Sequence, residues 1–247
     1  MARGSKKKGG VDAAGGHRGP LPSQTKGDTA QAIVRAGLSI VPAGGAVAEL
    51  IDLVIKPALD RRRDDWFNGL AADVQTLQDL PGAPTAEELS KNEVFVTTML
   101  NASAAAVRTH QQEKLDALRA AVINAALPMA PDEYEQFMFI RFVEELTPLH
   151  LRLLSYLRDP AGWYARYNIE KPNIYIGPRR AVLEAALPEL RERGEVYAQA
   201  DTELGARGLL SGSLSGMVSQ QALYDKLTSP RGDRFLDFIT APAPAKE

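Results

Sequence analysis

Residues 137–157, FMFIRFVEELTPLHLRLLSYL, form the most apolar stretch of this chain and constrain its fold more than any other segment. Thr147 and Pro148 interrupt the stretch near its middle. A threonine oxygen can cap free backbone N–H groups, and proline at the first helical position loses no donor that the helix needs. The segment therefore predicts two helices that meet at a corner, with different patterns of sequence on its two sides.

The sequence before this corner is Ala-rich and helical throughout, whereas short strand-like runs alternate with helices after it. We expect a mainly α protein, with an N-terminal helical bundle at residues 28–146 followed by a small α+β winged-helix-like domain at residues 147–239. Residues 1–27 and 240–247 are expected to be disordered tails. A chain of 247 residues that is 45% apolar can bury a packed core.

The predicted N-terminal tail is basic. It has seven glycines, no apolar periodicity, and six basic residues against one acidic residue, so it cannot bury enough surface to offset the entropy of ordering. Lys6, Lys7 and Lys8 suggest contact with nucleic acid or anionic lipid, and the alternative is a solubilising leader. GGVDAAGG follows where a secretory signal needs apolar residues. The missing apolar signal region and the absence of cysteine together predict a cytoplasmic protein, or one peripheral at the inner face of the membrane.

An apolar helical face is predicted just after a flexible break. Pro42, Gly44 and Gly45 interrupt the helical pattern and form a candidate hinge. The face that follows is a candidate membrane or partner surface and consists of Val47, Leu50, Ile51, Val54 and Ile55. Three charges in this helix each cost roughly 2.5–3.5 kcal/mol at a bilayer centre, and each Leu, Ile or Val returns only roughly 0.3–0.6 kcal/mol. A core helix is therefore favoured over an interfacial one, and a single membrane pass is not expected.

Several helix boundaries can be predicted in the bundle. Pro57 should end or kink the helix before it, and the next helix carries a stripe of Trp66, Leu70, Val74 and Leu77. Thr85 and Glu88 form a capping box that opens a helical region to residue 127, with a break near residues 109–111. Small residues at 102–107 permit close helix approach. PMAP at 128–131 should stop this region, and residues 132–146 form a helix filled by Phe137, Ile140 and Val143.

After the corner, we expect helices at residues 148–158, 178–187, 191–206 and 230–239, and strands at 173–176 and 222–228. Asp159 and Pro160 should close the first helix, and Gly208 should form a left-handed cap after the third. This order of helices and strands is that of a winged helix-turn-helix with one added C-terminal helix.

Three segments carry a resemblance to a known family: LTPLHLRLLSYL at 146–157, LGARGLL at 204–210 and LTSPRGDRFLDFI at 227–239. They resemble winged-helix modules of bacterial proteins, and the layout of residues 28–239 resembles the abortive-infection alpha family. In that family a Gly-interrupted apolar N-terminal segment and a helical region precede such a module. The resemblance implies a role in phage defence, exerted on the host cell or on a partner protein, and brings no catalytic residues with it.

No motif in the chain predicts catalysis. The phosphate-binding pattern G-x-x-x-x-G-K-[ST] does not occur, and GSLSG at 212–216 has Leu214 where a nucleophile elbow needs serine. His110 and Glu113 lie one helical turn apart, but no second histidine is near enough to complete a metal site. We therefore predict no enzyme activity, no cofactor, no metal and no small-molecule substrate.

Three classes of function are left open by these observations. The first is a non-enzymatic phage-defence or regulatory protein that acts through helix-mediated contacts with a protein partner, a second copy of itself or a membrane surface. The second is a winged-helix DNA-binding regulator, and the third is an enzyme of unrecognised type. Residues 191–207 offer DNA the side chains of Arg191, Arg193 and Arg207, but their net charge is −1. Phosphate contacts need positive charge, so any DNA binding should be weak.

Overall fold

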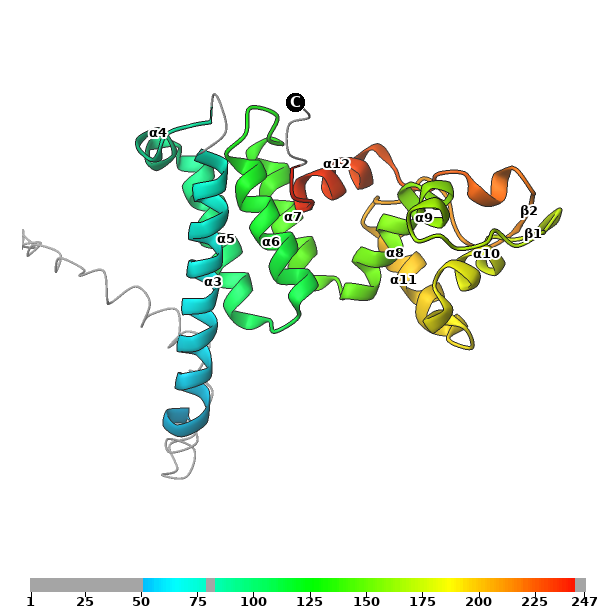
Figure 1. Cartoon of the computed structure of the whole chain (residues 1–247), viewed down its shortest axis with the longest axis horizontal. Coiled ribbons are helices and arrows are strands. Elements are labelled where there is room, and N and C mark those ends of the chain that lie inside the picture. The colour runs from blue at the N-terminus through cyan, green and yellow to red at the C-terminus, as the bar shows by residue number, and fades with distance from the viewer. Residues whose placement is uncertain (1–50, 79–82, 243–247) are drawn as a thin grey trace, which may run out of the picture. The chain divides into compact units, whose positions relative to one another are not determined.

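The computed structural model describes residues 51–78 and 83–242. Residues from Val54 onward belong to one compact unit. The described residues form ten α-helices, three short π or 3-10 segments and one two-stranded antiparallel sheet (Figure 1). The prediction of a mainly α protein is confirmed. Residues 1–27 and 243–247, which include most of the predicted tails, lie outside the described part of the chain.

The first described helix runs through the proline that was expected to break it. A π-helical turn, η1 (Ile51–Ile55), leads directly into α3 (Lys56–Gln78), with Pro57 in the first turn of α3. A first-turn residue needs no N–H donor, so proline is tolerated there. The chain stays helical across Pro57, but the helix changes from π to α just before this residue. The predicted apolar stripe is confirmed, because Trp66, Leu70 and Leu77 are all buried.

Residues 85–127 form three helices where one region with one break was expected. These are α4 (Ala86–Lys91), α5 (Glu93–Arg108) and α6 (Gln112–Ala125). The capping box is confirmed: Thr85 Oγ1 accepts from the Glu88 N–H at 3.2 Å, and the Thr85 N–H donates to Glu88 Oε2 at 2.7 Å. The break at 109–111 is also confirmed. The additional break falls at Asn92, whose side chain caps α5 by accepting from the Phe95 N–H at 3.1 Å.

The core of the bundle lies among α3, α5, α6 and α7 (Glu133–Glu145). Ala102, Ala105 and Ala106 of α5 are buried, so their small side chains permit the close packing predicted for this stretch. Trp66 of α3 is tied to the same helix, because its Nε1–H donates to Ser103 Oγ at 2.9 Å. The last helix of the chain, α12 (Pro230–Ile239), packs against α6 and α8 (Pro148–Arg158), so the C-terminal segment shares the core of the bundle.

The predicted corner at Thr147 and Pro148 is confirmed, with α7 ending before it and α8 beginning at Pro148. Asp159 and Pro160 end α8 as expected. These residues also begin a further helix, α9 (Pro160–Arg166), and Asp159 Oδ1 caps it by accepting from the Gly162 N–H at 2.8 Å. An aspartate followed by proline at the first helical position is a start signal as much as a stop signal.

The region after the corner differs from the prediction in its strands. Its helical elements are α10 (Arg179–Ala186), η2 (Pro188–Leu190), α11 (Gly194–Ala206) and η3 (Ala222–Tyr224). The strand expected at 173–176 lies instead at β1 (Ile176–Pro178), and it pairs antiparallel with β2 (Met217–Ser219), with Ile176 opposite Ser219. Residues 222–228 form η3 and a single bridge between Leu210 and Thr228 rather than a strand. Strand position depends on the pairing partner, which local sequence does not reveal.

Candidate interaction site

Most of the predicted apolar face and hinge falls outside the part of the chain that the structure describes. This applies to Pro42, Gly44, Gly45, Val47 and Leu50, and to the basic residues Lys6, Lys7 and Lys8. Ile51, Val54 and Ile55 lie in η1. The Val54 side chain is 54% exposed and Leu53 beside it is 74% exposed. Of the predicted face, Val54 is therefore exposed and Ile55 is half-buried.

The three arginines proposed for nucleic-acid contact do not lie within α11. Arg191 and Arg193 precede the helix, which begins at Gly194, and Arg207 follows it. Arg191 Nε donates to the carbonyl oxygen of Glu184 at 3.2 Å, and Arg207 Nη2 pairs with Glu145 Oε2 at 3.3 Å. The helix itself, GEVYAQADTELGA, contains three acidic residues and no basic residue. It is thus more acidic than the sequence interval 191–207 indicated.

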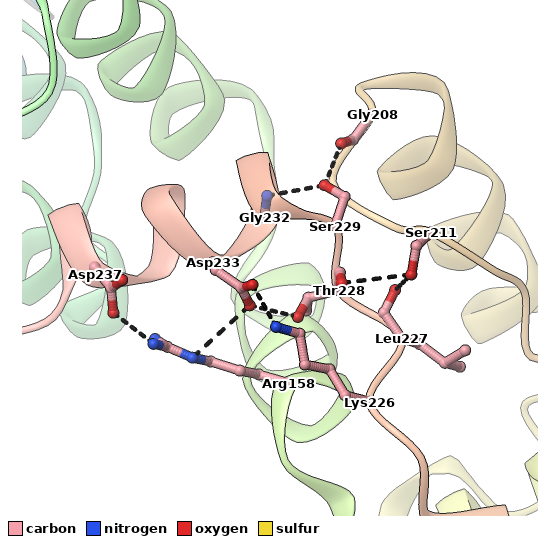
Figure 2. Close-up of polar contacts among 10 residues, drawn as sticks. All are labelled: Arg158, Gly208, Ser211, Lys226, Leu227, Thr228, Ser229, Gly232, Asp233 and Asp237. Carbon is pink, nitrogen blue, oxygen red and sulfur yellow. Dashed lines mark hydrogen bonds and ion pairs between the residues drawn. The ribbon is translucent and has the colours of Figure 1, made fainter. Parts of the chain in front are cut away.

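The segments that carry the family resemblance meet in a polar joint at the start of α12 (Figure 2). Gly208 has a φ of +69°, which confirms the predicted left-handed cap. Ser229 donates its Oγ–H to the carbonyl oxygen of Gly208 at 2.6 Å and its N–H to that of Leu209 at 2.9 Å, while its Oγ accepts from the Gly232 N–H at 3.0 Å. These contacts join the exit of α11 to the entry of α12, which is a structural role.

Charged groups complete this joint on the side of α8. Asp233 accepts from Thr228 Oγ1 at 2.6 Å and from the Lys226 ammonium, while Arg158 pairs with Asp237 at 2.6 Å (Figure 2). Burial alone would raise the pKa of Asp233, but the hydrogen bonds from Lys226 and Thr228 and the charges of Lys226 and Arg158 outweigh it. The pKa therefore lies below its usual value.

His150 is buried in α8. Its Nδ1 accepts from the Thr147 N–H at 3.3 Å, and its Nε2 lies 3.2 Å from Glu203 Oε2 without the alignment of a hydrogen bond. Burial lowers the pKa of this imidazole; the Glu203 carboxylate opposes that effect, and the Arg207 charge adds to it. The arrangement holds a neutral histidine between α8 and α11.

The outer side of α7 carries an exposed aromatic surface that the sequence did not indicate. Phe137 was expected to fill the core, but its side chain is 51% exposed, and Tyr134 is 72% exposed. The buried residues of α7 are Gln136, Phe139, Ile140 and Val143. Phe137 is two residues before Phe139, which turns it by roughly 200° and away from that face. The helical phase of the longer apolar residues was the signal that could have separated Phe137 from the core set.

A groove lies on each side of this aromatic surface. The first has a volume of about 310 Å³ and is bordered by Val94 and Thr97 of α5 together with Tyr134 and Phe137. The second, of about 220 Å³, runs along α7 from Tyr134 past Phe137 and Met138 to Arg141. Phe137 borders both grooves and therefore forms a ridge between them. We call the surface made by Glu133, Tyr134, Phe137, Met138 and Arg141 the α7 face.

The charges of the α7 face have opposite sign at its two ends. Glu133 lies one helical turn before Phe137 and Arg141 one turn after it, and both are exposed. Arg141 pairs with Glu145 of the same helix at 3.1 Å, with 61% and 43% of the two side chains exposed. Such an exposed pair contributes only about 0–1 kcal/mol, so Arg141 can exchange it for another carboxylate.

Two classes of site are not found in residues 51–78 and 83–242. Within these ranges no group of three or more His, Asp or Glu side chains is placed to hold a metal ion, and His110 and Glu113 have no third ligand beside them. No helix in the same ranges is both long and apolar enough to cross a membrane.

Comparisons with known proteins found no match to this chain. No protein-family model matches the chain, no curated protein is similar to it, and no solved structure resembles it. Its function must therefore be inferred from the surfaces described above.

Proposed function

We propose that this protein is a non-enzymatic regulatory protein that acts through helix-mediated protein contacts, and that its α7 face is the contact surface. The observation that carries the proposal is the exposed ridge of Tyr134 and Phe137 between two grooves. Aromatic side chains that lie exposed beside grooves are the usual anchors of protein interfaces. The partner that fits this surface best is a second copy of the same chain.

Charge complementarity supports self-association. If two α7 helices pack antiparallel with their Phe137 side chains at the two-fold axis, Glu133 of each copy faces Arg141 of the other, because both residues lie four positions from Phe137. Two ion pairs then form at the rim while Phe137 of each copy enters a groove of the other. Such an isologous contact is self-complementary and closes at the dimer. One helix face is smaller than the roughly 800 Å² per partner of a standard interface, so a micromolar dimer is expected.

A setting in phage defence is proposed on the resemblance of residues 146–157, 204–210 and 227–239 to the abortive-infection alpha family. The DNA-binding alternative has less support. The helix that would enter a DNA groove, α11, carries three acidic residues and no basic one, and Arg207 is engaged by Glu145. Phosphate contacts supply most of the non-specific affinity for DNA, and α11 would repel the phosphates.

Sedimentation velocity across the micromolar range tests self-association. We expect Phe137→Glu to abolish the dimer and Leu100→Glu to leave it intact, because Leu100 is 61% exposed but borders neither groove. Glu133→Arg and Arg141→Glu should each weaken the dimer by placing like charges opposite one another, and the double variant should restore it. A protein that is monomeric throughout, or a double variant no better than the singles, would refute this packing.

Plating of phage on bacteria that express the protein tests the setting. We expect fewer plaques with the wild-type chain and with Leu100→Glu, and loss of that protection with Phe137→Glu. Protection that survives Phe137→Glu would separate the defence role from the α7 face. If the wild-type chain does not protect against any phage, the defence setting is wrong, whatever the oligomeric state.

A further inference from the structure

A recess of about 290 Å³ lies where α5 ends and α6 begins, and it shares no lining residue with the α7 face. Ala105 and Leu118 contribute its apolar lining. Its polar lining comes from the turn between the two helices and from α7, and consists of Arg108, Thr109, His110, Gln111, Lys114 and Glu144. Arg108 and Lys114 are basic and Glu144 is acidic, so these three side chains together carry a net positive charge.

Lys114 is the unusual member of this set because its side chain is buried, with the residue only 8% exposed. Its ammonium donates to the backbone carbonyl oxygen of Glu144 at 2.6 Å. The carboxylate of Glu144 is taken by Arg108, whose Nε lies 2.9 Å from Glu144 Oε1. In the described part of the chain no carboxylate forms an ion pair with Lys114, and no second acceptor receives its remaining protons.

A buried ammonium without a counter-ion is costly, because the energy of removing the charge from water is not repaid. Burial accordingly lowers the pKa of Lys114, and the Glu144 carboxylate opposes this only in part. An anion that enters the recess, which Lys114 lines, would supply the counter-charge.

The first turn of α6 supplements the buried ammonium. Its cap residue, Gln111, makes no side-chain hydrogen bond to the N–H groups of the helix, although the Lys114 N–H donates to the Gln111 carbonyl oxygen at 3.1 Å. The Gln111 N–H donates instead to Thr109 Oγ1 at 3.1 Å. The N–H groups of a first turn point out of the end of the helix and carry a partial positive charge, which favours oxyanions. Here that end borders the recess, whose rim also holds the exposed imidazole of His110.

We infer that this recess binds a phosphate group, either as inorganic phosphate or as a phosphate monoester, with the Lys114 ammonium as its anchor. Phosphate fits better than a single carboxylate because it offers three or four acceptor oxygens to the several donors that line the recess: an ammonium, a helix end and an imidazole. Arg108 adds positive charge while it neutralises Glu144. The recess is open on one side, so the organic part of a monoester can remain in solvent.

Calorimetric titration of the intact protein with inorganic phosphate, and separately with phenyl phosphate, tests this site. We expect saturable binding with a dissociation constant below about 1 mM, and at least tenfold weaker binding by Lys114→Met. Lys91→Met is the matched control, because Lys91 is an exposed lysine paired only with Glu87 of its own helix. It should bind phosphate like the wild type. Sodium chloride at the same ionic strength should produce no binding heat.

Thermal unfolding supplies a second readout that a purely structural lysine would not produce. Without phosphate, Lys114→Met should melt at the same or a higher temperature than the wild type, because it removes an unpaired buried charge while keeping most of the side-chain volume. With phosphate, the wild type and Lys91→Met should gain stability and Lys114→Met should not. Equal phosphate effects in all three proteins, or no saturable binding to the wild type up to 10-fold above the expected constant, would overturn the inference.

Discussion

Gly232 allows α12 to dock on the exit of α11, and replacing it with alanine should separate the two. A Cβ atom added at Gly232 would lie 2.2 Å from the Leu209 carbonyl oxygen and 3.1 Å from the Leu209 carbonyl carbon. Both are backbone atoms, so no side chain can rotate away to make room. The Leu209 oxygen also accepts the Ser229 N–H at 2.9 Å, and Ser229 Oγ–H donates to Gly208. Any shift that relieves the overlap must stretch these two hydrogen bonds.

Three contributions set the change in the free energy of unfolding that we expect for Gly232→Ala. Loss of two hydrogen bonds removes about 1 kcal/mol each, and overpacking adds about 1–3 kcal/mol. Replacement of glycine within a helix returns at most about 1 kcal/mol. Gly232→Ala should therefore lower the free energy of unfolding by about 2–4 kcal/mol, which is a large part of the stability of an ordinary domain.

Gly205→Ala is the matched control for this substitution. Gly205 also lies in a helix, α11, but an added Cβ there meets no atom within 4 Å. The same chemical change should raise stability by about 0.5–1 kcal/mol. Urea unfolding followed by circular dichroism measures both variants against the wild type. A Gly232→Ala protein as stable as the wild type would refute the close approach, and destabilisation of both variants would mean that helical glycine matters for another reason.

Two further substitutions test the cap and the buried histidine. Gly208→Val should lower the free energy of unfolding by at least about 1 kcal/mol in the same urea assay, because a β-branched residue resists a φ of +69°. Gly208→Asn should lower it by less. Equal losses in the two variants would point to contact with Arg231 instead. Because the folded-state pKa of His150 lies below its unfolded value near 6.5, the unfolded chain binds the proton more readily, so stability should fall as pH drops below about 6.5. His150→Gln should flatten that dependence between about pH 7 and 5, and an unchanged slope would mean that groups other than His150 cause it.

Local sequence was sufficient for the helical elements with strong boundary signals. Thr85 and Glu88 form their capping box, the turn at 109–111 separates two helices, and Pro148 begins a helix after Thr147. Gly208 adopts the left-handed conformation expected of a glycine after a helix. These features depend on hydrogen bonds and steric contacts within a few residues, and such contacts are encoded where they occur.

Local sequence was insufficient wherever the outcome depended on a distant partner. The strand at 176–178 is positioned by its pairing with 217–219, and residues 222–228 lack the continuous partner that would have made them a strand. The acidic charge of α11 was underestimated from the sequence because Arg191 and Arg193 lie before the residue at which the helix begins. The interval 191–207 therefore looked more basic than the helix that it contains.

The two proposed sites also required the tertiary structure. Helical phase could have set Phe137, which is exposed, apart from Phe139, which is fully buried, but the packing of α5, α6 and the α12 phenylalanines decides which side of α7 is covered. Lys114 resembles any lysine on an amphipathic helix, and only the approach of α7 buries it and directs Arg108 to Glu144. The sequence by itself determined where most helices begin and end, because capping acts over one turn. The tertiary structure alone decided which side chains are exposed and which charges are left unpaired, because burial depends on elements far apart in the chain.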